Sequence, residues 1–208
     1  MPKPPPSLLP ALPRSFTAID FETANEFQRA SACAVAVIRV EDNQIVDQRD
    51  WLINPQTHFS SVCIAIHGIT PKKVAQSGSF AEVWEDGLKD WFDSDTYLVA
   101  HNMGFDNSVL LGSLARYGLL PPRYRRNCSY QLSKKLFPGL LSYSLPNVAR
   151  HFGLPAFPHH QADADAEACA RIMIKLNQIA ITCPLLRKKI QAKTLSAAEL
   201  RKHGFAPD

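Results

Sequence analysis

Hydrophobic and polar residues are distributed so that strands are predicted early in the chain and helices later. Three apolar, β-branched runs separated by turn-forming residues are typical of an antiparallel meander: residues 16–20, 32–40 and 45–53. Four segments have apolar residues at helical spacing: residues 80–92, 105–117, 144–152 and 162–179. Two short apolar strands lie between helices: residues 97–100 and 126–129. This order predicts an α/β domain with a mixed five-stranded sheet and helices on both faces.

The two ends of the chain differ in composition from this central part. Residues 1–14 contain six prolines, which fix φ and lack a backbone donor, so we expect a flexible, extended N-terminal tail. Residues 181–208 form a basic C-terminal tail, in which 195–203 has the capping-box spacing of a short helix. The ordered domain is therefore expected at residues 15–180.

Composition indicates a globular protein with one core. The chain has 208 residues, 46% of them hydrophobic, which is enough to bury a core. The five cysteines are widely spaced and form no C-x-x-C pair, which favours reduced thiols over zinc ligation or disulfides. We find no signal-peptide pattern and no run of ~20 apolar residues, so we expect a cytoplasmic protein without membrane contact.

The positive charge is unevenly distributed along the chain. The formal net charge is only +4, but no Asp or Glu occurs between Leu120 and Gln161. This acid-free segment is either a solvated basic face or a wall that attracts phosphates. Its candidate contacts to a nucleic-acid backbone are Arg123, Arg125 and Arg126.

Acidic residues occur where predicted strands end and predicted helices begin. Asp20 and Glu22 are two residues apart at the end of the first strand, so they point to one face and repel each other unless a cation lies between them. Asp106 begins the helix that follows the strand at 97–100. Asp165 begins the long helix, whose alanines at every fourth position predict a close approach to the sheet. Each motif alone is compatible with an ordinary helix start or strand end.

Taken together and in this order, the three motifs resemble those of the DEDD exonucleases that carry a histidine in the third motif. The D-x-E motif is matched by Asp20 and Glu22, and the H-N-x-x-F-D motif from His101 to Asp106. The H-x-A-x-x-D motif is matched from His160 to Asp165. An HGI-T loop stands at residues 67–70, and the resemblance covers residues 16–179. Where proofreading subunits continue the first motif with T-T-G, this chain has T-A-N, which is more like the stand-alone members.

The resemblance implies an RNase H-like three-layer fold and a two-metal mechanism. Asp20 would bridge the cations, Glu22 and Asp165 would hold the one that carries the attacking water, and Asp106 would serve the second. His160 would be the general base, because its ordinary pKa suits proton transfer near neutral pH. Hard oxygen ligands favour Mg²⁺ or Mn²⁺. The implied substrate contacts are Phe21, Thr23, His67, Asn102, Phe105 and His160.

The resulting hypothesis is a metal-dependent 3′–5′ exonuclease that releases nucleoside monophosphates from single-stranded or frayed DNA. Three alternatives remain open from the motifs. The substrate could be RNA, the protein could be a non-catalytic nucleic-acid-binding module, or it could dock on a DNA polymerase through its C-terminal tail. The sequence does not decide the oligomeric state.

Overall fold

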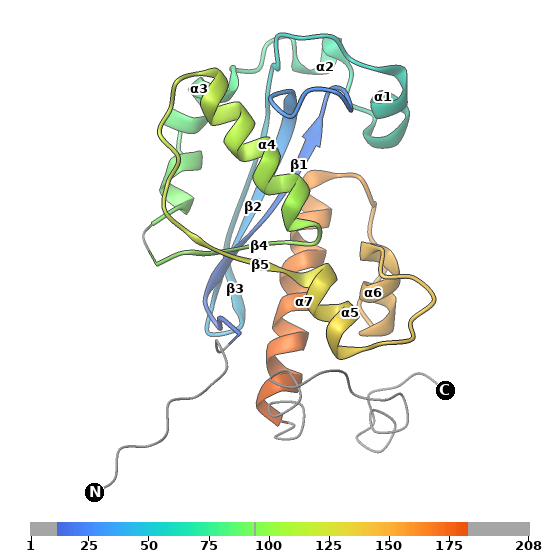
Figure 1. Ribbon diagram of the computed structural model, residues 1–208. Coiled ribbons are helices and arrows are strands. Elements are labelled where there is room, and N and C mark those ends of the chain that lie inside the picture. The colour runs from blue at the N-terminus through green and yellow to red at the C-terminus, as the bar shows by residue number, and fades with distance from the viewer. Residues whose placement is uncertain (1–11, 94, 183–208) are drawn as a thin grey trace, which may run out of the picture.

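In the computed structural model, which describes residues 12–93 and 95–182, a five-stranded sheet forms the middle layer (Figure 1). Its strands follow the spatial order β3-β2-β1-β4-β5. Their bounds are β1 Phe16–Thr23, β2 Ala32–Glu41, β3 Gln44–Leu52, β4 Tyr97–Ala100 and β5 Arg125–Cys128. The first three strands pair antiparallel, whereas β4 pairs parallel to β1 and β5 parallel to β4. The predicted mixed five-stranded sheet is confirmed.

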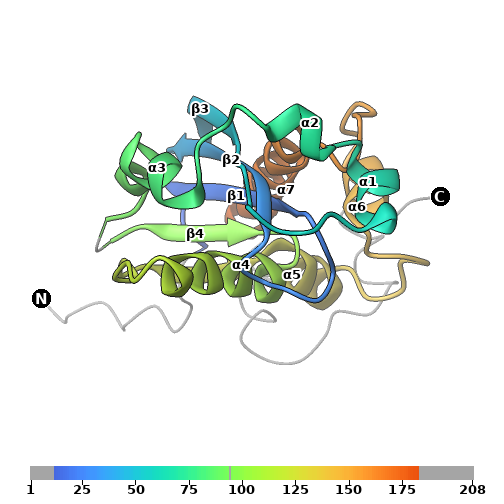
Figure 2. The same cartoon turned by 90° about the horizontal axis from the view of Figure 1, so that it is seen from above.

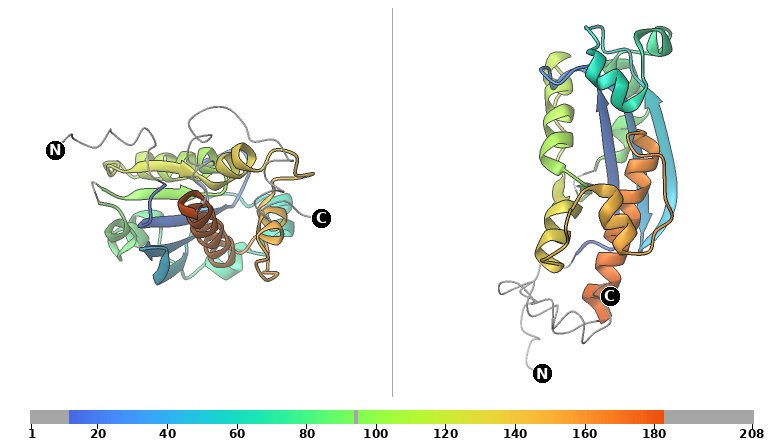
Figure 3. Two further views of the ribbon diagram at one scale, coloured as in Figure 1. Left: turned by 90° about the horizontal axis from the view of Figure 1, so that it is seen from below. Right: turned by 90° about the vertical axis from the view of Figure 1, so that its right-hand side faces the viewer.

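Helices cover both faces of the sheet and one of its ends. Their bounds are α1 Ser61–His67, α2 Pro71–Val74, α3 Phe80–Glu85, the 3₁₀ helix η1 Leu88–Trp91, α4 Met103–Arg116, α5 Ser129–Leu136, α6 Leu145–His151 and α7 Ala162–Thr182. Figure 3 shows α4 and α7 on opposite sides of the sheet. The short helices α1 and α2 lie beyond the carboxyl end of β1 (Figures 1 and 2). None of the described helices has the length and apolar character needed to cross a membrane.

Alternation along the strands divides the apolar core into two clusters. Ala18 of β1 faces the cluster beneath α7, whereas Ile19 faces the cluster beneath α3 and α4. The α7 side is built from small residues, because Ala162, Ala166 and Ala170 are all buried there. Small side chains let a helix approach a sheet closely, as the alanine spacing predicts.

Four segments differ from the sequence-based prediction. The helix expected at 80–92 is split into α3 and η1, because Gly87 has φ +127° and interrupts the α-helical hydrogen bonding. Helix α1 was not predicted. It contains five β-branched or apolar residues in a row, yet Ser60 caps its first turn through the backbone N–H of Cys63. Helix α2, which follows α1, and helix α5, which follows β5 directly, were not predicted either.

The beginning of the described chain is fastened to the far part of α7. Pro13 is buried, and its carbonyl oxygen accepts a hydrogen bond from the Asn177 amide at 2.6 Å. The same amide donates to the Asn43 side chain at 2.9 Å. Thus residues 12–14, which composition assigns to the tail, belong to the folded part. The rest of the proline-rich segment and the helix predicted at 195–203 lie outside the described residues.

Candidate active site

The carboxyl end of β1 presents two acids to the α7 side of the sheet. Asp20 and Glu22 have the same parity as Ala18, so their side chains point toward the layer that contains α7. The register with β2 shifts between Glu22 and Thr23, and the regular ladder ends there. The pleat therefore produces the shared face that the D-x-E spacing predicts.

The third acid comes from α4, which packs on the other side of β1. Asp106 lies in the first turn of this helix and is only 3% exposed. Its Oδ1 accepts a hydrogen bond from the backbone N–H of Phe21 at 3.0 Å. This bond ties the start of α4 to the residue between Asp20 and Glu22, so helix and strand hold their carboxylates in one place.

The fourth acid begins α7. Asp165 is 4% exposed, whereas Asp163, two residues earlier on the same helix, points to solvent. One carboxylate oxygen each from Asp20, Glu22 and Asp165 lie within 4.8 Å of one another. The structure thus brings together acids that are far apart in the sequence: Asp20 and Asp165 are separated by 145 positions.

The loop before α7 contributes two adjacent histidines in different ways. Nδ1 of His159 lies 2.8 Å from Oδ2 of Asp165, and the backbone N–H of His160 donates to the same oxygen at 3.0 Å. His160 has φ +68°, a left-handed conformation that is uncommon for a residue with a side chain. The two imidazole rings stack at 3.8 Å between centroids. The motif spacing predicts His160 as the functional histidine. It does not predict the contact between the His159 ring and Asp165.

Electrostatics in this cluster oppose ionisation of the acids. Burial raises the pKa of Asp20 well above its usual range, and repulsion from Asp106, Asp165 and Glu22 adds to the effect. Burial and the nearby carboxylates raise the pKa of Glu22 to about 8, and burial raises that of Asp106 to about 7. No lysine or arginine in the described ranges forms an ion pair with any of them. Among the described residues, Asp20, Glu22 and Asp106 therefore have no ion-pair partner, and only Asp165 has one, the imidazole of His159.

The acids line a cavity of about 620 Å³, a size typical of ligand sites. Among the predicted substrate contacts, Phe21, Asn102, Phe105 and His160 lie in its wall. The wall also contains residues that the motifs did not single out for binding: His101, Tyr130, Tyr143, Ser144, Leu145 and His159. The sequence offered one indication of their role, which is their position. His101 and Tyr130 follow β4 and β5, and ligand sites gather at strand ends, while the others lie at the starts of α6 and α7.

Two other predicted contacts, Thr23 and His67, are not in the wall of the cavity. His67 engages both ring nitrogens within the protein, since Nδ1 accepts from the Ile69 N–H and Nε2 donates to the Thr23 carbonyl. This pair of bonds fastens the end of α1 to the end of β1.

The three arginines lie elsewhere. Arg125 begins β5 and pairs in register with Tyr97 at the start of β4, at the end of these strands remote from the acids. Its guanidinium donates to the Tyr97 hydroxyl at 2.8 Å. Arg123 and Arg126 flank it in sequence, and none of the three lines the cavity.

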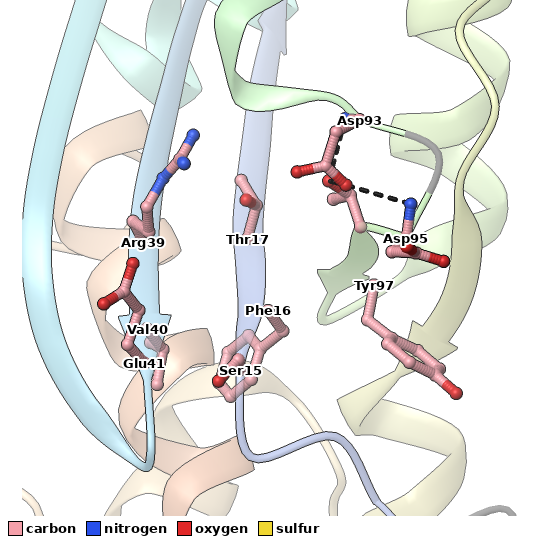
Figure 4. A pocket seen from close by; sticks show the side chains of 10 residues that line it. Ser15, Phe16, Thr17, Arg39, Val40, Glu41, Asp93, Asp95 and Tyr97 are labelled. Carbon is pink, nitrogen blue, oxygen red and sulfur yellow. Dashed lines mark hydrogen bonds between the residues drawn. The ribbon is translucent and has the colours of Figure 1, made fainter.

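A second cavity, of about 230 Å³, opens at the opposite end of β1 (Figure 4). It also contains acids, and one of them, Asp93, is stabilised in its ionised form. Hydrogen bonds from Thr96 and the Asp95 backbone, together with Arg39, lower the pKa of Asp93. None of the predicted site residues lines this second cavity.

The donor set at the acid cluster fits hard divalent cations. Carboxylate oxygens from Asp20, Glu22 and Asp165 could ligate one ion directly, and Asp106 lines the same cavity. Their burial without a cationic partner is unfavourable in the metal-free protein and would be relieved by a bound cation. The chemistry of the site therefore supports the predicted dependence on divalent metal.

Comparison with known proteins gives relatives of one kind. A family model described as exonuclease, of the RNase T type, matches residues 17–173. The chain is 30% identical over 90% of its length to a PolC-type DNA polymerase III of Thermotoga maritima. It is 28% identical over 78% of its length to the DNA polymerase III subunit epsilon of Aquifex aeolicus, covering 80% of that protein. By contrast, it spans only between 10% and 13% of the PolC-type relatives.

Among solved structures, one of exonuclease X in complex with 5′ overhanging duplex DNA aligns with a TM-score of 0.65 and 25% identity. The alignment covers 85% of this chain and 99% of that one. The matched region contains all four acids and both histidines of the cluster. The chain therefore belongs to the exonuclease family, which confirms the resemblance to DEDD-type 3′–5′ exonucleases with a third-motif histidine that its motifs indicate.

Proposed function

We propose that this 3′–5′ exonuclease removes nucleoside monophosphates from the 3′ end of single-stranded or frayed DNA, using two Mg²⁺ or Mn²⁺ ions. The observation that carries the proposal is the cluster of four acids, none of them paired with a lysine or arginine of the described chain, in a cavity of nucleotide-binding size. Such a cluster attracts divalent cations and repels a phosphodiester until they are bound. Hydrolysis would therefore depend strictly on metal.

The acids would divide the ligand duties according to their positions. Asp20 lies centrally, since Glu22, Asp106 and Asp165 all act on its pKa, and it would bridge the two ions. Glu22 and Asp165 would complete one site and Asp106 would serve the other, directly or through water. When bound, the cations supply positive charge to the phosphate oxygens and lower the pKa of a water molecule.

His160 would accept the proton of the attacking water. Partial burial, and to a smaller extent the charge of His159, lowers the pKa of His160, so its imidazole is neutral and basic at pH 7. The hydrogen bond from its backbone to Asp165 holds the residue beside the acids while the side chain stays partly exposed. His159 would orient Asp165 rather than take the proton, because its Nδ1 is engaged with that carboxylate.

The 3′-terminal nucleoside would lie against Phe105, as the resemblance predicts. The ring of Phe105 is half-buried in the cavity wall, and the guanidinium of Arg29 lies 5.0 Å from its centroid. An aromatic ring flanked by a cation suits a base and its phosphate. Because a terminal nucleotide must leave the base stack to enter the cavity, unpaired ends should be preferred.

The decisive experiment is digestion of a 5′-labelled single-stranded oligonucleotide with and without Mg²⁺. We expect a ladder of labelled products that shorten one nucleotide at a time, and no products in EDTA. Immediate release of a labelled mononucleotide would contradict 3′–5′ polarity. Asp165→Asn should be inactive, whereas Asp163→Asn, on the solvent side of the same helix, should retain activity.

Substrate class is decided by the same assay on matched DNA and RNA strands and on a blunt duplex. Faster trimming of RNA would replace DNA as the substrate without affecting the site. Absence of turnover on all three, with binding intact, would indicate a non-catalytic binding module instead.

A second proposal concerns a partner, and the named relatives motivate it. Because relatives are DNA polymerase III subunits, we propose that the chain associates with a DNA polymerase through residues 181–208. The test is co-purification of a replicative polymerase with the full chain and with a chain that ends at residue 182. Equal recovery by both would eliminate the tail as the docking segment.

A further inference from the structure

Tyr130 is a cavity residue that the family motifs leave without a role. It is the second residue of α5, immediately after β5, and its half-buried ring lines the cavity that contains the four acids. Most aromatic residues of this protein fill the core, whereas this ring faces the space where substrate must enter. This position makes the ring a candidate contact for substrate.

The surroundings of Tyr130 fix the position of its ring. His101 contacts it edge-on at 5.9 Å and Tyr143 at 6.2 Å between centroids. His101 in turn is held at both ring nitrogens, with Nε2 donating to the Tyr143 carbonyl at 2.8 Å and Nδ1 accepting from Ser129 Oγ at 2.9 Å. A rigid aromatic ring at a cavity wall loses little freedom when a base binds, which favours affinity.

Positive charge lies next to this ring. The ammonium of Lys134, one turn further along α5, is 6.0 Å from the Tyr130 ring centroid. This distance is at the outer limit of a cation–π contact, and Lys134 is exposed, so a phosphate could readily replace the contact. A ring for the base and a cation for the phosphate are the two parts of a single-strand binding site.

A scissile phosphodiester joins two nucleosides, and the cavity offers aromatic rings from separate elements. Phe105 comes from α4 and Tyr130 from α5, while the acids line the same space. If the terminal nucleoside lies at Phe105, the nucleoside on the 5′ side of the scissile bond needs another place. Tyr130 is a half-buried ring of the described wall that comes from another element than Phe105, whereas the hydroxyl of Tyr143, the neighbouring wall residue, is hydrogen-bonded to the Phe137 carbonyl.

We propose that Tyr130 and Lys134 form a subsite for the penultimate nucleotide, with Tyr130 stacking on its base and Lys134 binding its 5′-phosphate. The proposal rests on the proposed exonuclease function and goes further, since it names a second nucleotide position. Affinity for a single strand should therefore depend on the presence of a base at the penultimate position. The identity of that base should matter little, because stacking uses the π-face that all bases share.

The first test measures binding of a 5′-fluorescent single-stranded DNA in Ca²⁺, so that it does not depend on turnover. Tyr130→Leu should weaken binding about tenfold, and Tyr130→Phe should bind like the wild type because the ring is retained. Tyr97→Leu, at the remote end of β4, is the matched control and should bind normally. Equal weakening in the Phe and Leu variants would show that the hydroxyl acts, and would overturn stacking.

A second test identifies the nucleotide through its base. An abasic site at the penultimate position should weaken binding to the wild type about tenfold and have little further effect on Tyr130→Leu. An abasic site three positions from the end should weaken both proteins equally. If the penultimate abasic site weakens both proteins equally as well, Tyr130 does not contact that base and the proposal fails.

Lys134 is tested by salt dependence. Lys134→Gln should reduce the slope of log K against log salt by about one contact, whereas Lys175→Gln should not. Lys175 is exposed on α7, about 15 Å along the helix from Asp165. An unchanged slope for Lys134→Gln would remove Lys134 from the subsite.

Comparing the hydrolysis of two substrates distinguishes a failure of the subsite proposal from a failure of the proposed exonuclease function. A p-nitrophenyl ester of thymidine 5′-phosphate lacks the second base and its 5′-phosphate. In Tyr130→Leu the KM for oligonucleotides should therefore rise about tenfold, and the KM for the ester should rise much less. If the wild type hydrolyses neither substrate, the proposed function fails, and the binding tests still decide the subsite. Equal KM for oligonucleotides in wild type and Tyr130→Leu would refute the subsite alone.

Discussion

The two ends of β1 both adjoin cavities with acids, yet the pKa of Asp93 at one end and those of the acid cluster at the other are shifted in opposite directions. At the amino end, hydrogen bonds and Arg39 lower the pKa of Asp93 (Figure 4). At the carboxyl end, burial and mutual repulsion raise the pKa values of Asp20, Glu22 and Asp106. The number of acids therefore does not distinguish a metal site from a solvated turn. What distinguishes it is burial of carboxylates that have no lysine or arginine partner among the described residues.

The largest expected effect is the loss of hydrolysis when a carboxylate of the acid cluster at the carboxyl end of β1 is removed. Asp20→Asn should lower the hydrolysis rate about 10³-fold or more, because the ion bridge is lost. In metal-free buffer the same variant should unfold at a higher temperature than the wild type, because repulsion is relieved. Steady-state kinetics and thermal melts in EDTA measure both effects. A variant that is inactive and also less stable without metal would contradict the repulsive cluster.

The adjacent histidines should respond differently. His160→Ala should lower kcat about 10²- to 10⁴-fold, as loss of a general base does. His159→Ala should mainly raise the Mg²⁺ concentration needed for half-maximal activity, about tenfold, because Asp165 loses its orienting partner. Titration of activity against Mg²⁺ separates the two. The opposite assignment of effects would make His159 the base.

Stability of the metal-free protein should fall as pH rises. The pKa of Glu22 is raised from 4.5 to about 8, so the folded state binds more protons than the unfolded state between these values. The loss should be on the order of a few kcal/mol across this window and should vanish in Mg²⁺, since cations compensate the charge. Urea unfolding at pH 5 and pH 8, with EDTA or Mg²⁺, tests this. A pH-independent midpoint in EDTA would be the contrary result.

The smallest effect is expected at the amino end. Asp93→Ala removes hydrogen bonds to Thr96 and to the Asp95 backbone, which should cost about 1 kcal/mol or less because the group is exposed. The contribution of Asp93 has the opposite pH sign: it is present above pH 3.8 and disappears as the pH falls below that. Activity should remain that of the wild type. Lost activity would mean that the two ends are coupled.

Much of the fold was predictable because its elements have strong periodic patterns. The strands and α7 follow from alternation and from helical spacing, and the four acids follow from their places at element ends. Helix α1 was not predictable from propensity, because its β-branched sequence is held helical by the Ser60 cap and by His67 bonding to Ile69 and Thr23. The break at Gly87 was not predicted, because the apolar spacing of residues 80–92 continues on both sides of the Asp86-Gly87 pair.

The parts of the site that the sequence did not predict depend on backbone conformation and on long-range placement. Spacing identified His160, but the left-handed backbone that directs the His159 ring to Asp165 cannot be read from spacing. The acid-free segment grouped Arg125 with the site, although the parallel register puts it at the remote end of β5. Tyr130 carried no motif, and only the position of α5 beside the cavity reveals it.

The bond between Asn177 and Pro13 has a consequence for access to the acid cluster. It holds the first described residues against the distal part of α7, about 18 Å along the helix from Asp165. Residues 12–14 and the distal turns of α7 therefore lie together, away from the acid cluster. Neither of these two segments stands between the acids and an approaching nucleic-acid strand.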